Sequence, residues 1–461
     1  MNNIKLISLI TIIFVIFSFV QIFAISLEES IILAKENNKE INSEKNAIQA
    51  SEWGEKNALT NFLPKVSFNS TMVRLDNETF ESASEIMNIP VFDSTNTVIG
   101  SMPFSAAALS SGFYKTSFNN NITIRQPIFN GGKVIIGHQL SKLAKEQALF
   151  SLQNKENDIT FQVASTYFNI LKIQELIKLT EKSIESSKRQ IVKVQDNIEV
   201  GFAKESDILM WQVKIQNEET SLFEIKNNLK VLLAVWQNLL GVDDKENFPS
   251  LIDVKNYNQE IQMFSNMNEA QIEEETKDFL SKTEEMNITL KTLKTVDKML
   301  GKSLLMAKGS FLPSLNLQFT YEIESDDKFN FSGNDNWNLV AAFSLPIFSG
   351  GSNYTNLKKV KYENRKAKLA SENVREKILI GAKKAFYDKI TKAQTVENNK
   401  SALNYAKENQ KLINNLYDQG MITNNELLDS EIMIFASEMN LIASYYNYLN
   451  SSYETKKYLS K

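Results

Sequence analysis

The chain of 461 residues contains no cysteine and only one histidine, His138. The absence of cysteine excludes disulfides, thiolate metal sites and a lipid-modified N-terminal cysteine. A single imidazole makes most metal sites and histidine-based catalytic sites improbable. We therefore expect no cofactor, no bound metal and no enzymatic activity, and we assign no role to His138.

Glycine and proline are also scarce, with 15 and 7 residues respectively, which suits long helices better than a loop-rich fold. The formal net charge of −4 gives no reason to expect nucleic acid or an anionic membrane surface as a partner.

A long hydrophobic run occurs only at the N-terminus, where residues 6–24 follow Lys5 and end in Ile22-Phe23-Ala24. This pattern predicts a secretory signal peptide over residues 1–24, and the alternative is an uncleaved transmembrane anchor. No other stretch approaches the roughly 18 apolar residues that a spanning helix needs. Any further membrane insertion must therefore be non-helical.

A repeated segment organises the chain. Gln126-Pro127-Ile128-Phe129-Asn130-Gly131-Gly132 returns as Leu345-Pro346-Ile347-Phe348-Ser349-Gly350-Gly351, and the same offset pairs Gly201 with Gly420. Such a long register indicates a duplicated half-protein. The predicted first repeat, at 25–241, contains a helix, a β-hairpin at 64–128, a long helix at 132–200 and a helix at 204–241. A mid-height linker is predicted at 242–268. The predicted second repeat, at 269–461, contains a helix, a β-hairpin at 313–347, a long helix at 351–419 and a helix at 424–460.

Each hairpin begins where Phe-Leu-Pro ends a helix, at Pro64 and at Pro313. Beyond each proline the hydrophobic period changes to two, with one apolar and one polar face, and a long loop is expected at about 76–113. Strands of about ten such residues are typical of transmembrane β-barrels, and the alternative is a soluble, half-buried hairpin. Four strands cannot close a barrel, so a barrel would require several copies of the chain.

The glycine pairs mark the strand-to-helix junctions. The Walker spacing of a phosphate loop is absent, so we interpret the pairs as hinges with permissive backbones. The predicted junction residues are Pro127, Gly131, Gly132, Pro346, Gly350 and Gly351.

Very long helices follow these junctions. No proline lies between Gly132 and Gly201, which allows a helix on the order of 100 Å. β-Branched residues recur at every seventh position from Val163 to Ile198, a pattern typical of helices paired in a left-handed supercoil. From the helix lengths we expect 204–241 to stack end to end on 269–309, and 26–61 to stack on 424–460.

The order of these motifs resembles that of TolC-family outer-membrane efflux channels over essentially the whole mature chain. The residues that carry the resemblance are Leu27-Glu28-Glu29-Ser30, Phe62-Leu63-Pro64, Gln126 to Gly132, Val200-Gly201-Phe202 with Asp207, Phe311-Leu312-Pro313 and Gly420 to Asp429. No single motif is decisive, but their order, spacing and duplication together are specific.

The resemblance implies a mainly α fold with β. Long antiparallel coiled-coil helices would form a periplasmic α-barrel, and two hairpins would give four strands to a trimeric, 12-stranded transmembrane β-barrel. It implies a homotrimer in outer-membrane lipid that works as a passive exit duct for efflux or type I secretion. The expected partners are a periplasmic adaptor (membrane fusion) protein and an inner-membrane pump of RND, ABC or MFS type, and the sequence does not reveal the cargo.

The resemblance also places a periplasmic gate at the helical tips. It implies a bond between Asp207 and Tyr417, acidic rings at Glu426 and Asp429, and adaptor contacts at Gly201, Phe202, Gly420 and Met421. The family arginine is replaced by Ile422. Alternative interpretations are a capping box for Glu426, a helix-dipole contact for Asp207 and ordinary packing for Tyr417.

The competing functional hypothesis is a periplasmic coiled-coil adaptor or scaffold anchored by its N-terminus. Such an adaptor should carry a compact β domain between two helical arms, and the sequence has none. The strict alternation in residues 314–345 favours the channel.

Overall fold

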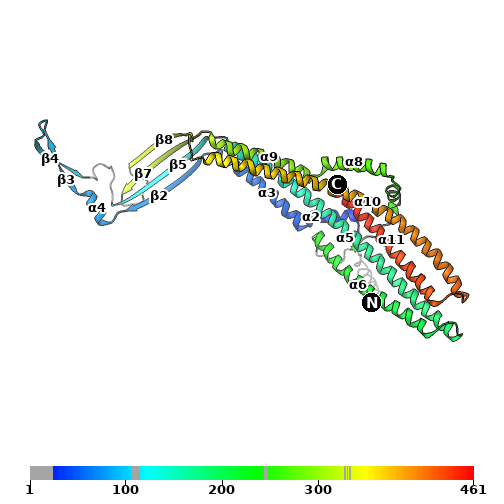
Figure 1. Cartoon of the computed structure of the whole chain (residues 1–461). Coiled ribbons are helices and arrows are strands. Elements are labelled where there is room, and N and C mark those ends of the chain that lie inside the picture. Colours follow the sequence, from blue (N-terminus) through cyan, green and yellow to red (C-terminus); the bar gives the residue numbers. More distant parts are fainter. Residues whose placement is uncertain are drawn as a thin grey trace, which may run out of the picture. The chain divides into compact units, whose positions relative to one another are not determined.

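The computed structural model describes residues 24–105, 115–242, 248–326, 329, 331 and 334–460. The predicted signal peptide, apart from Ala24, lies outside the described residues. The chain forms two compact units, one from Met1–Gln49, Glu146–Thr295 and Leu369–Lys461, the other from Ala50–Lys145 and Val296–Lys368. The boundary crosses four long helices, so the same helices contribute to both units (Figure 1).

The helices, in chain order, are α2 (Leu27–Asn37), α3 (Lys39–Thr60), α4 (Asn77–Ser84), α5 (Lys133–Glu199), α6 (Glu205–Leu240), α7 (Asn258–Ser265), α8 (Glu269–Met286), α9 (Ile288–Lys308), α10 (Ser352–Asp418) and α11 (Asn424–Tyr458), with 3₁₀ turns η2 (Val254–Tyr257) and η3 (Gly309–Phe311). The strands are β1 (Ala24–Ile25), β2 (Lys65–Arg74), β3 (Ile86–Phe92), β4 (Val98–Ser105), β5 (Thr116–Asn130), β6 (Phe248–Pro249), β7 (Ser314–Asp326) and β8 (Asn334–Ser344). None of the described helices has a segment long and apolar enough to cross a bilayer.

The second unit contains a four-stranded antiparallel sheet in the order β2-β5-β7-β8. The predicted alternation gives this sheet two different faces. One face carries Asn69, Asn121 and Arg125, and hydrogen bonds along it join Asn69 to Asn121 (3.0 Å) and Arg125 to Gln318 (3.0 Å). The opposite face is apolar and exposed in the single chain, and it carries Val66, Phe68, Met72, Ile122, Trp337, Leu339 and Phe343. The fold class, mainly α with four paired strands, is confirmed.

The loop expected at about 76–113 was a wrong prediction. This stretch contains α4 and a separate two-stranded sheet of β3 and β4. Pro90, Gly100 and Pro103 favour a loop in the sequence, but proline is tolerated in strands that lack a neighbour on one side. The part of this prediction at residues 106–113 lies outside the described residues.

The two junctions differ in detail. In the first repeat β5 continues through Pro127 by means of a bulge and ends at Asn130, whereas in the second repeat β8 ends at Ser344. The difference arises because β5 is a central strand with partners on both sides and β8 is an edge strand. Gly131 has φ +67° and passes so close to Gly309 that a Cβ atom would lie 2.1 Å from the Gly309 carbonyl oxygen.

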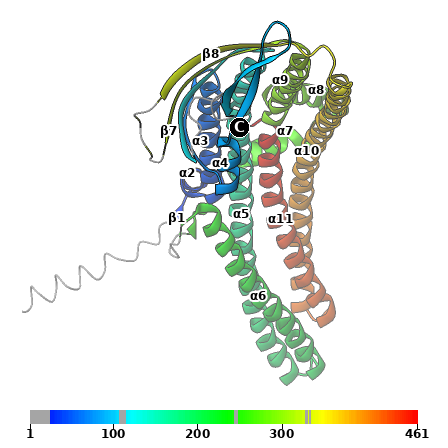
Figure 2. The ribbon, with the colours of Figure 1, turned by 90° about the vertical axis from the view of Figure 1, so that its left-hand side faces the viewer.

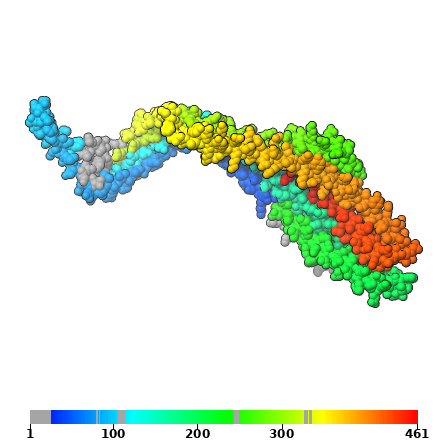
Figure 3. All heavy atoms as spheres, viewed as in Figure 1, coloured from blue at the N-terminus to red at the C-terminus, as the bar shows by residue number. Residues whose placement is uncertain are grey.

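In the first unit, α5, α6, α10 and α11 run side by side, with α11 between α10 and the α5–α6 pair in two perpendicular views (Figure 1, Figure 2). The space-filling view shows the red surface of α11 flanked by the orange surface of α10 on one side and by the teal-to-green surface of α5 and α6 on the other (Figure 3). The heptad row of α5 contributes Val163, Ile170 and Ile184 to the buried residues. Small Ser430, Ser444 and Ser451 are buried on α11, where each hydroxyl donates to its own helix.

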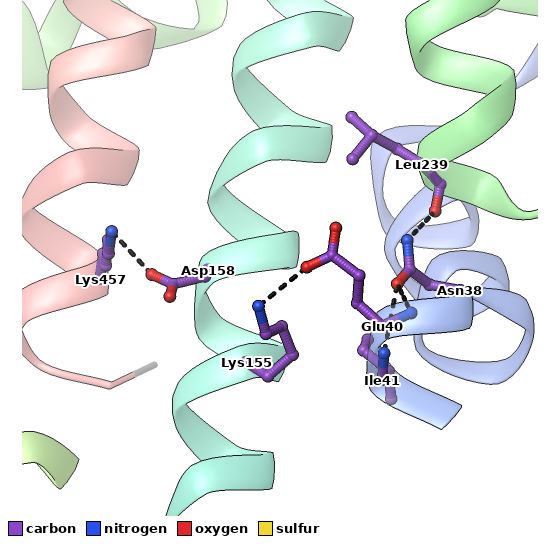
Figure 4. Close-up of polar contacts among 7 residues, drawn as sticks. All are labelled: Asn38, Glu40, Ile41, Lys155, Asp158, Leu239 and Lys457. Carbon is purple, nitrogen blue, oxygen red and sulfur yellow. Dashed lines mark hydrogen bonds and ion pairs between the residues drawn. The ribbon is translucent and has the colours of Figure 1, made fainter. Parts of the chain in front are cut away.

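The predicted end-to-end stacking was wrong in its partners and in its helix lengths. The helix expected at 26–61 is broken at Asn38, and the helix expected at 269–309 is broken at Asn287. Asn38 accepts from Glu40 N–H (2.9 Å) to start α3 and donates to the Leu239 carbonyl at the end of α6 (2.9 Å) (Figure 4).

Asn287 does the same for the other repeat. It accepts from Leu290 N–H (3.2 Å) and donates to the Tyr458 carbonyl at the end of α11 (3.0 Å). Helix α6 therefore ends against the α2–α3 break, and α11 ends against the α8–α9 break. The end of a second helix can pack against a helix interruption that is capped by asparagine. The asparagine side chain then bonds a free N–H group of the helix that it starts and a free carbonyl group of the helix that ends there.

Ion pairs flank these joints. Lys155 of α5 contacts Glu40 at 2.8 Å, and Lys457 of α11 contacts Asp158 at 2.7 Å (Figure 4). The predicted non-helical linker at 242–268 instead contains η2 and α7, whose buried Ile261 and Phe264 pack into the main core. Residues 243–247 of that linker lie outside the described residues.

Candidate functional site at the helical tips

Both tips end in the same backbone motif. Gly201 (φ +81°) donates to the Ile198 carbonyl and Phe202 donates to the Asn197 carbonyl, at 3.0 and 2.8 Å. Gly420 (φ +71°) and Met421 repeat this pattern with the carbonyls of Tyr417 and Leu416, at 2.9 Å each. This pair of bonds is the Schellman motif, which needs a left-handed residue and so favours glycine. The tip turns are therefore fixed by backbone geometry.

The residue after each tip glycine is apolar and points into solvent in the single chain. Phe202 is 83% exposed and Met421 is 68% exposed. The Schellman motif usually packs this residue against its own helix. Its exposure at both tips leaves two apolar side chains available for contact with another molecule.

Carboxylates begin both returning helices. The Asp207 carboxylate accepts from Lys204 N–H at 2.9 Å at the start of α6. The Glu426 carboxylate accepts from Thr423 N–H at 2.7 Å and from the Thr423 hydroxyl at 2.9 Å, while Glu426 N–H donates to that hydroxyl at 3.4 Å. The backbone N–H of Thr423 lowers the pKa of Glu426, so this side chain stays charged near neutral pH. The capping interpretation of Glu426 therefore describes its contacts in one chain.

The bond expected between Asp207 and Tyr417 does not occur among the described residues. The Asp207 carboxylate accepts a hydrogen bond from the Lys204 backbone N–H, and the Tyr417 hydroxyl accepts one from the Asn197 side chain at 3.4 Å. Both residues nevertheless line one cleft of about 440 Å³ between the two tips, together with Ile422. Asp429, one turn after Glu426, is exposed.

A small core fixes the two tips to each other. Val194 of α5, Trp211 of α6 and Leu427 of α11 are buried together, and Ile198, Ile208 and Tyr417 pack around them. The Trp211 indole N–H donates to the Asn424 side-chain oxygen at 2.9 Å, and Trp211 is fully buried. The Asn424 side-chain N–H group is buried without a partner among the described atoms. This contact joins the first repeat to the second at the point where the chain reverses.

The sequence did not single out Trp211 or Asn424, although their hydrogen bond joins the two tips. Trp211 fits the apolar stripe of its helix, so its pattern predicts ordinary packing. Asn424 follows the N-cap residue Thr423, so the pattern predicts only that it is the first residue of a helix. The one available signal was the polar hydrogen of a tryptophan on a buried stripe, since a buried indole usually finds an acceptor.

A buried ion pair lies between helices α5 and α6, farther from the tips than Trp211. Lys214 and Glu218, one turn apart on α6, are 2.9 Å apart with side chains only 7% and 9% exposed. The Lys214 ammonium also donates to Ser187 of α5 at 2.6 Å, and Ser183 donates to Glu218 at 2.8 Å. These polar groups interrupt the apolar seam at one level. A polar level of this kind can fix the register of paired helices.

Comparisons with known proteins agree with this geometry. The family model for "Outer membrane efflux protein" matches residues 31–242 and 303–459. Outer membrane protein TolC of Escherichia coli (strain K12) is 20% identical over 369 residues, which cover 76% of this chain and 71% of that protein.

Two solved structures are similar over almost the whole chain. The CmeC outer membrane channel of Campylobacter jejuni has a TM-score of 0.72 at 16% identity, covering 94% of this chain and 85% of CmeC. The open state of the MtrE outer membrane channel of Neisseria gonorrhoeae has a TM-score of 0.72 at 13% identity, covering 94% and 88%. These likenesses establish the fold. The family match covers most of the chain, so the chain belongs to the outer membrane efflux protein family, and it is an outer-membrane efflux duct whose helical part lies in the periplasm.

Proposed function

We propose that three copies of this chain assemble into a passive duct that carries out no chemical step. The observation that carries the proposal is the four-stranded sheet of the second unit. Among the described strands, β2 and β8 each pair on one side only, so both edges are open. The unpaired N–H and C=O groups of an exposed sheet edge tend to pair with another chain, and closing the sheet into a barrel removes such edges.

The two faces of the sheet support the same assembly. The apolar face, with Phe68, Trp337 and Phe343, suits contact with lipid, and the polar face with its asparagine ladder suits a water-filled lumen. Three sheets of four strands give the twelve strands of the expected barrel, which exceeds the minimum of about eight that can close. One chain cannot close it.

Energy and cargo selection then come from partners. We propose a periplasmic adaptor protein and an inner-membrane pump of RND, ABC or MFS type. Exposed Phe202 and Met421 at the tips support an adaptor contact, because both are apolar side chains beside backbone turns fixed by Gly201 and Gly420.

The assembly is tested with the full chain produced in cells that carry an outer membrane. The protein should fractionate with outer membranes and show the mass of three chains in detergent. A monomer that remains in the periplasmic fraction would instead support the coiled-coil scaffold anchored by its N-terminus.

We further propose that the tips form the periplasmic gate. Opening requires the α10–α11 hairpin to leave the α5–α6 hairpin, and the Trp211–Asn424 hydrogen bond joins these two hairpins. The cleft between the tips holds Asp207 and Tyr417 as additional members of the gate. Asp207→Ala and Tyr417→Phe should each raise single-channel conductance, and unchanged conductance in both variants would remove these two residues from the gate.

The exposed carboxylates Glu426 and Asp429 complete the proposed gate. Three copies of each would place a ring of negative charge at the entrance, and such rings favour cations. Glu426→Gln combined with Asp429→Asn should move the reversal potential in a salt gradient toward zero. An unaltered reversal potential would contradict the ring.

A further inference from the structure

The hairpin of β3 and β4 stands apart from the other strands. Its residues pair in an antiparallel register that includes Ile89 with Met102, and among the described strands it pairs with no other. Its turn is well defined, because the Asp93 carboxylate accepts from the backbone N–H groups of Thr95 and Thr97, at 2.8 and 2.9 Å. The two strands are labelled in Figure 1.

One face of this hairpin is entirely apolar. Because cross-strand partners share a face, the register places Met87, Ile89, Val91, Met102 and Phe104 together. Met87 is 57% exposed and Met102 is 56% exposed. An isolated two-stranded hairpin is marginally stable in water, so this face requires a covering surface.

The composition of the hairpin favours protein over lipid as that surface. Residues 86–105 contain one charged side chain, Asp93, and no lysine, arginine, tryptophan or tyrosine. Lysine and arginine anchor proteins to anionic headgroups, and tryptophan and tyrosine anchor them at the membrane interface. A surface rich in methionine, phenylalanine and β-branched residues and depleted of charge is typical of the core of a protein interface.

The position of the hairpin in the chain identifies the partner. It follows β2, an edge strand of the sheet, and it lies at the end of β2 opposite to the α3 connection. In the proposed trimer β2 lies at the seam between subunits, so each hairpin begins beside a neighbouring copy. The helical part lies in the periplasm, so this end of the sheet is the outer mouth.

We propose that the three β3–β4 hairpins pack against one another through the face of Met87, Ile89, Val91, Met102 and Phe104, and that they narrow the outer mouth of the duct. The proposal rests on the proposed trimer. Cyclic symmetry presents the same apolar face on all three copies, so one hairpin sequence can cover itself when these faces turn toward the axis. The duct then has a constriction at each end, a polar gate at the tips and an apolar one at the mouth.

The absence of cysteine permits a clean test. Met102→Cys places a thiol on the apolar face, and Ser101→Cys places one on the opposite face of the same strand. Intact cells carrying either full-length variant are treated with a short bifunctional maleimide. Covalent dimers from Met102→Cys and none above background from Ser101→Cys are expected. Equal cross-linking in both variants, or none in Met102→Cys, would overturn the proposal.

The same samples separate this proposal from the proposed function. The detergent-extracted mass reports whether the trimer exists, independently of the cross-link. A trimer without the Met102→Cys cross-link removes the hairpin contact and keeps the duct, whereas a monomer removes the duct. As a second measurement, Ile89→Ser with Met102→Ser should raise the conductance of the trimer, and Ser101→Ala should leave it unchanged. Quenching of a dye at position 102 by spin-labelled lipid would assign the face to the membrane and overturn the proposal.

Discussion

Loss of the indole N–H at Trp211 should open the gate that we propose at the helical tips. In Trp211→Phe the aromatic ring remains in the core of Val194 and Leu427, but the 2.9 Å bond to Asn424 disappears. The Asn424 amide is then buried without any partner for its oxygen, which costs about 1–3 kcal/mol in the closed tip. In an open tip this amide meets water and the cost vanishes.

In the proposed trimer, three subunits multiply the effect on the opening equilibrium. At about 1 kcal/mol for each subunit, a concerted opening is favoured by about 3 kcal/mol, which shifts the open-to-closed ratio by on the order of a hundredfold. The assay is single-channel recording of the purified trimer in planar bilayers. The fraction of time in the high-conductance state should rise strongly in Trp211→Phe and in Asn424→Ala, and the double variant should open no more than either single variant.

The chain offers a matched control. Trp236 is equally buried, but its indole N–H has no hydrogen-bond partner among the described atoms. Trp236→Phe therefore makes the same chemical change without the loss of a bond, and its gating should equal that of the wild type. If Trp211→Phe also gates like the wild type, or if Trp236→Phe opens the channel equally, the hydrogen bond does not hold the tip closed.

Three further predictions concern stability. Gly131→Ala should prevent assembly or lower the melting temperature by several degrees, because the new methyl group would lie 2.1 Å from the Gly309 carbonyl oxygen. The control Gly132→Ala has φ +77° but no atom within 4 Å of the new methyl group, so it should cost only about 1 kcal/mol in thermal unfolding. Equal losses of stability in the two variants would contradict the clash at Gly131. Lys214→Met should destabilise the α5–α6 helical hairpin by about 3 kcal/mol in chemical denaturation, because it leaves the buried Glu218 side chain without its ion-pair partner. Lys214→Met combined with Glu218→Leu should recover most of this loss, and a double variant as unstable as the single one would contradict this explanation. The folded pKa of Glu426 is lowered below its ordinary value of 4.5, so its stabilising contribution to the start of α11 should be fully present above pH 4.5 and be lost as the pH falls through the folded pKa. Hydrogen exchange at the Thr423 amide should follow this pH dependence in the wild type and show no such step in Glu426→Gln.

Much of the fold could be predicted because its signals are local and repeated. The period of two beyond Pro313 defines β7 and β8, and the proline-free stretch after Gly132 defines α5. The tip turns follow from single glycines, since the Schellman motif needs a left-handed residue at one position.

The errors arose where a contact joins distant segments. Asn38 and Asn287 lie in otherwise helical sequences, and their breaks become favourable only because the ends of α6 and α11 supply carbonyl groups there. The β3–β4 hairpin was missed because Pro90 and Pro103 resemble loop residues when no sheet partner is known.

In the candidate site, too, the features set by local sequence could be predicted and those set by contacts between distant segments could not. The positions of Gly201, Gly420 and the capping Glu426 follow from local rules, and the structure places them at the two tips. The partner of Tyr417 and the bond between Trp211 and Asn424 depend on how two hairpins pack side by side, which no local pattern encodes.

Whether three chains close one barrel can be tested by a cross-link across the seam between neighbouring subunits. Thr71→Cys on β2 is combined in turn with Asn336→Cys and with Asn338→Cys on β8, and all three positions lie on the same polar face by the observed registers. In the proposed trimer, at least one pair should form disulfides between subunits in the membrane, and the covalent ladder should end at three chains. Monomers alone from both pairs, or a ladder that continues beyond three chains, would contradict the trimeric barrel.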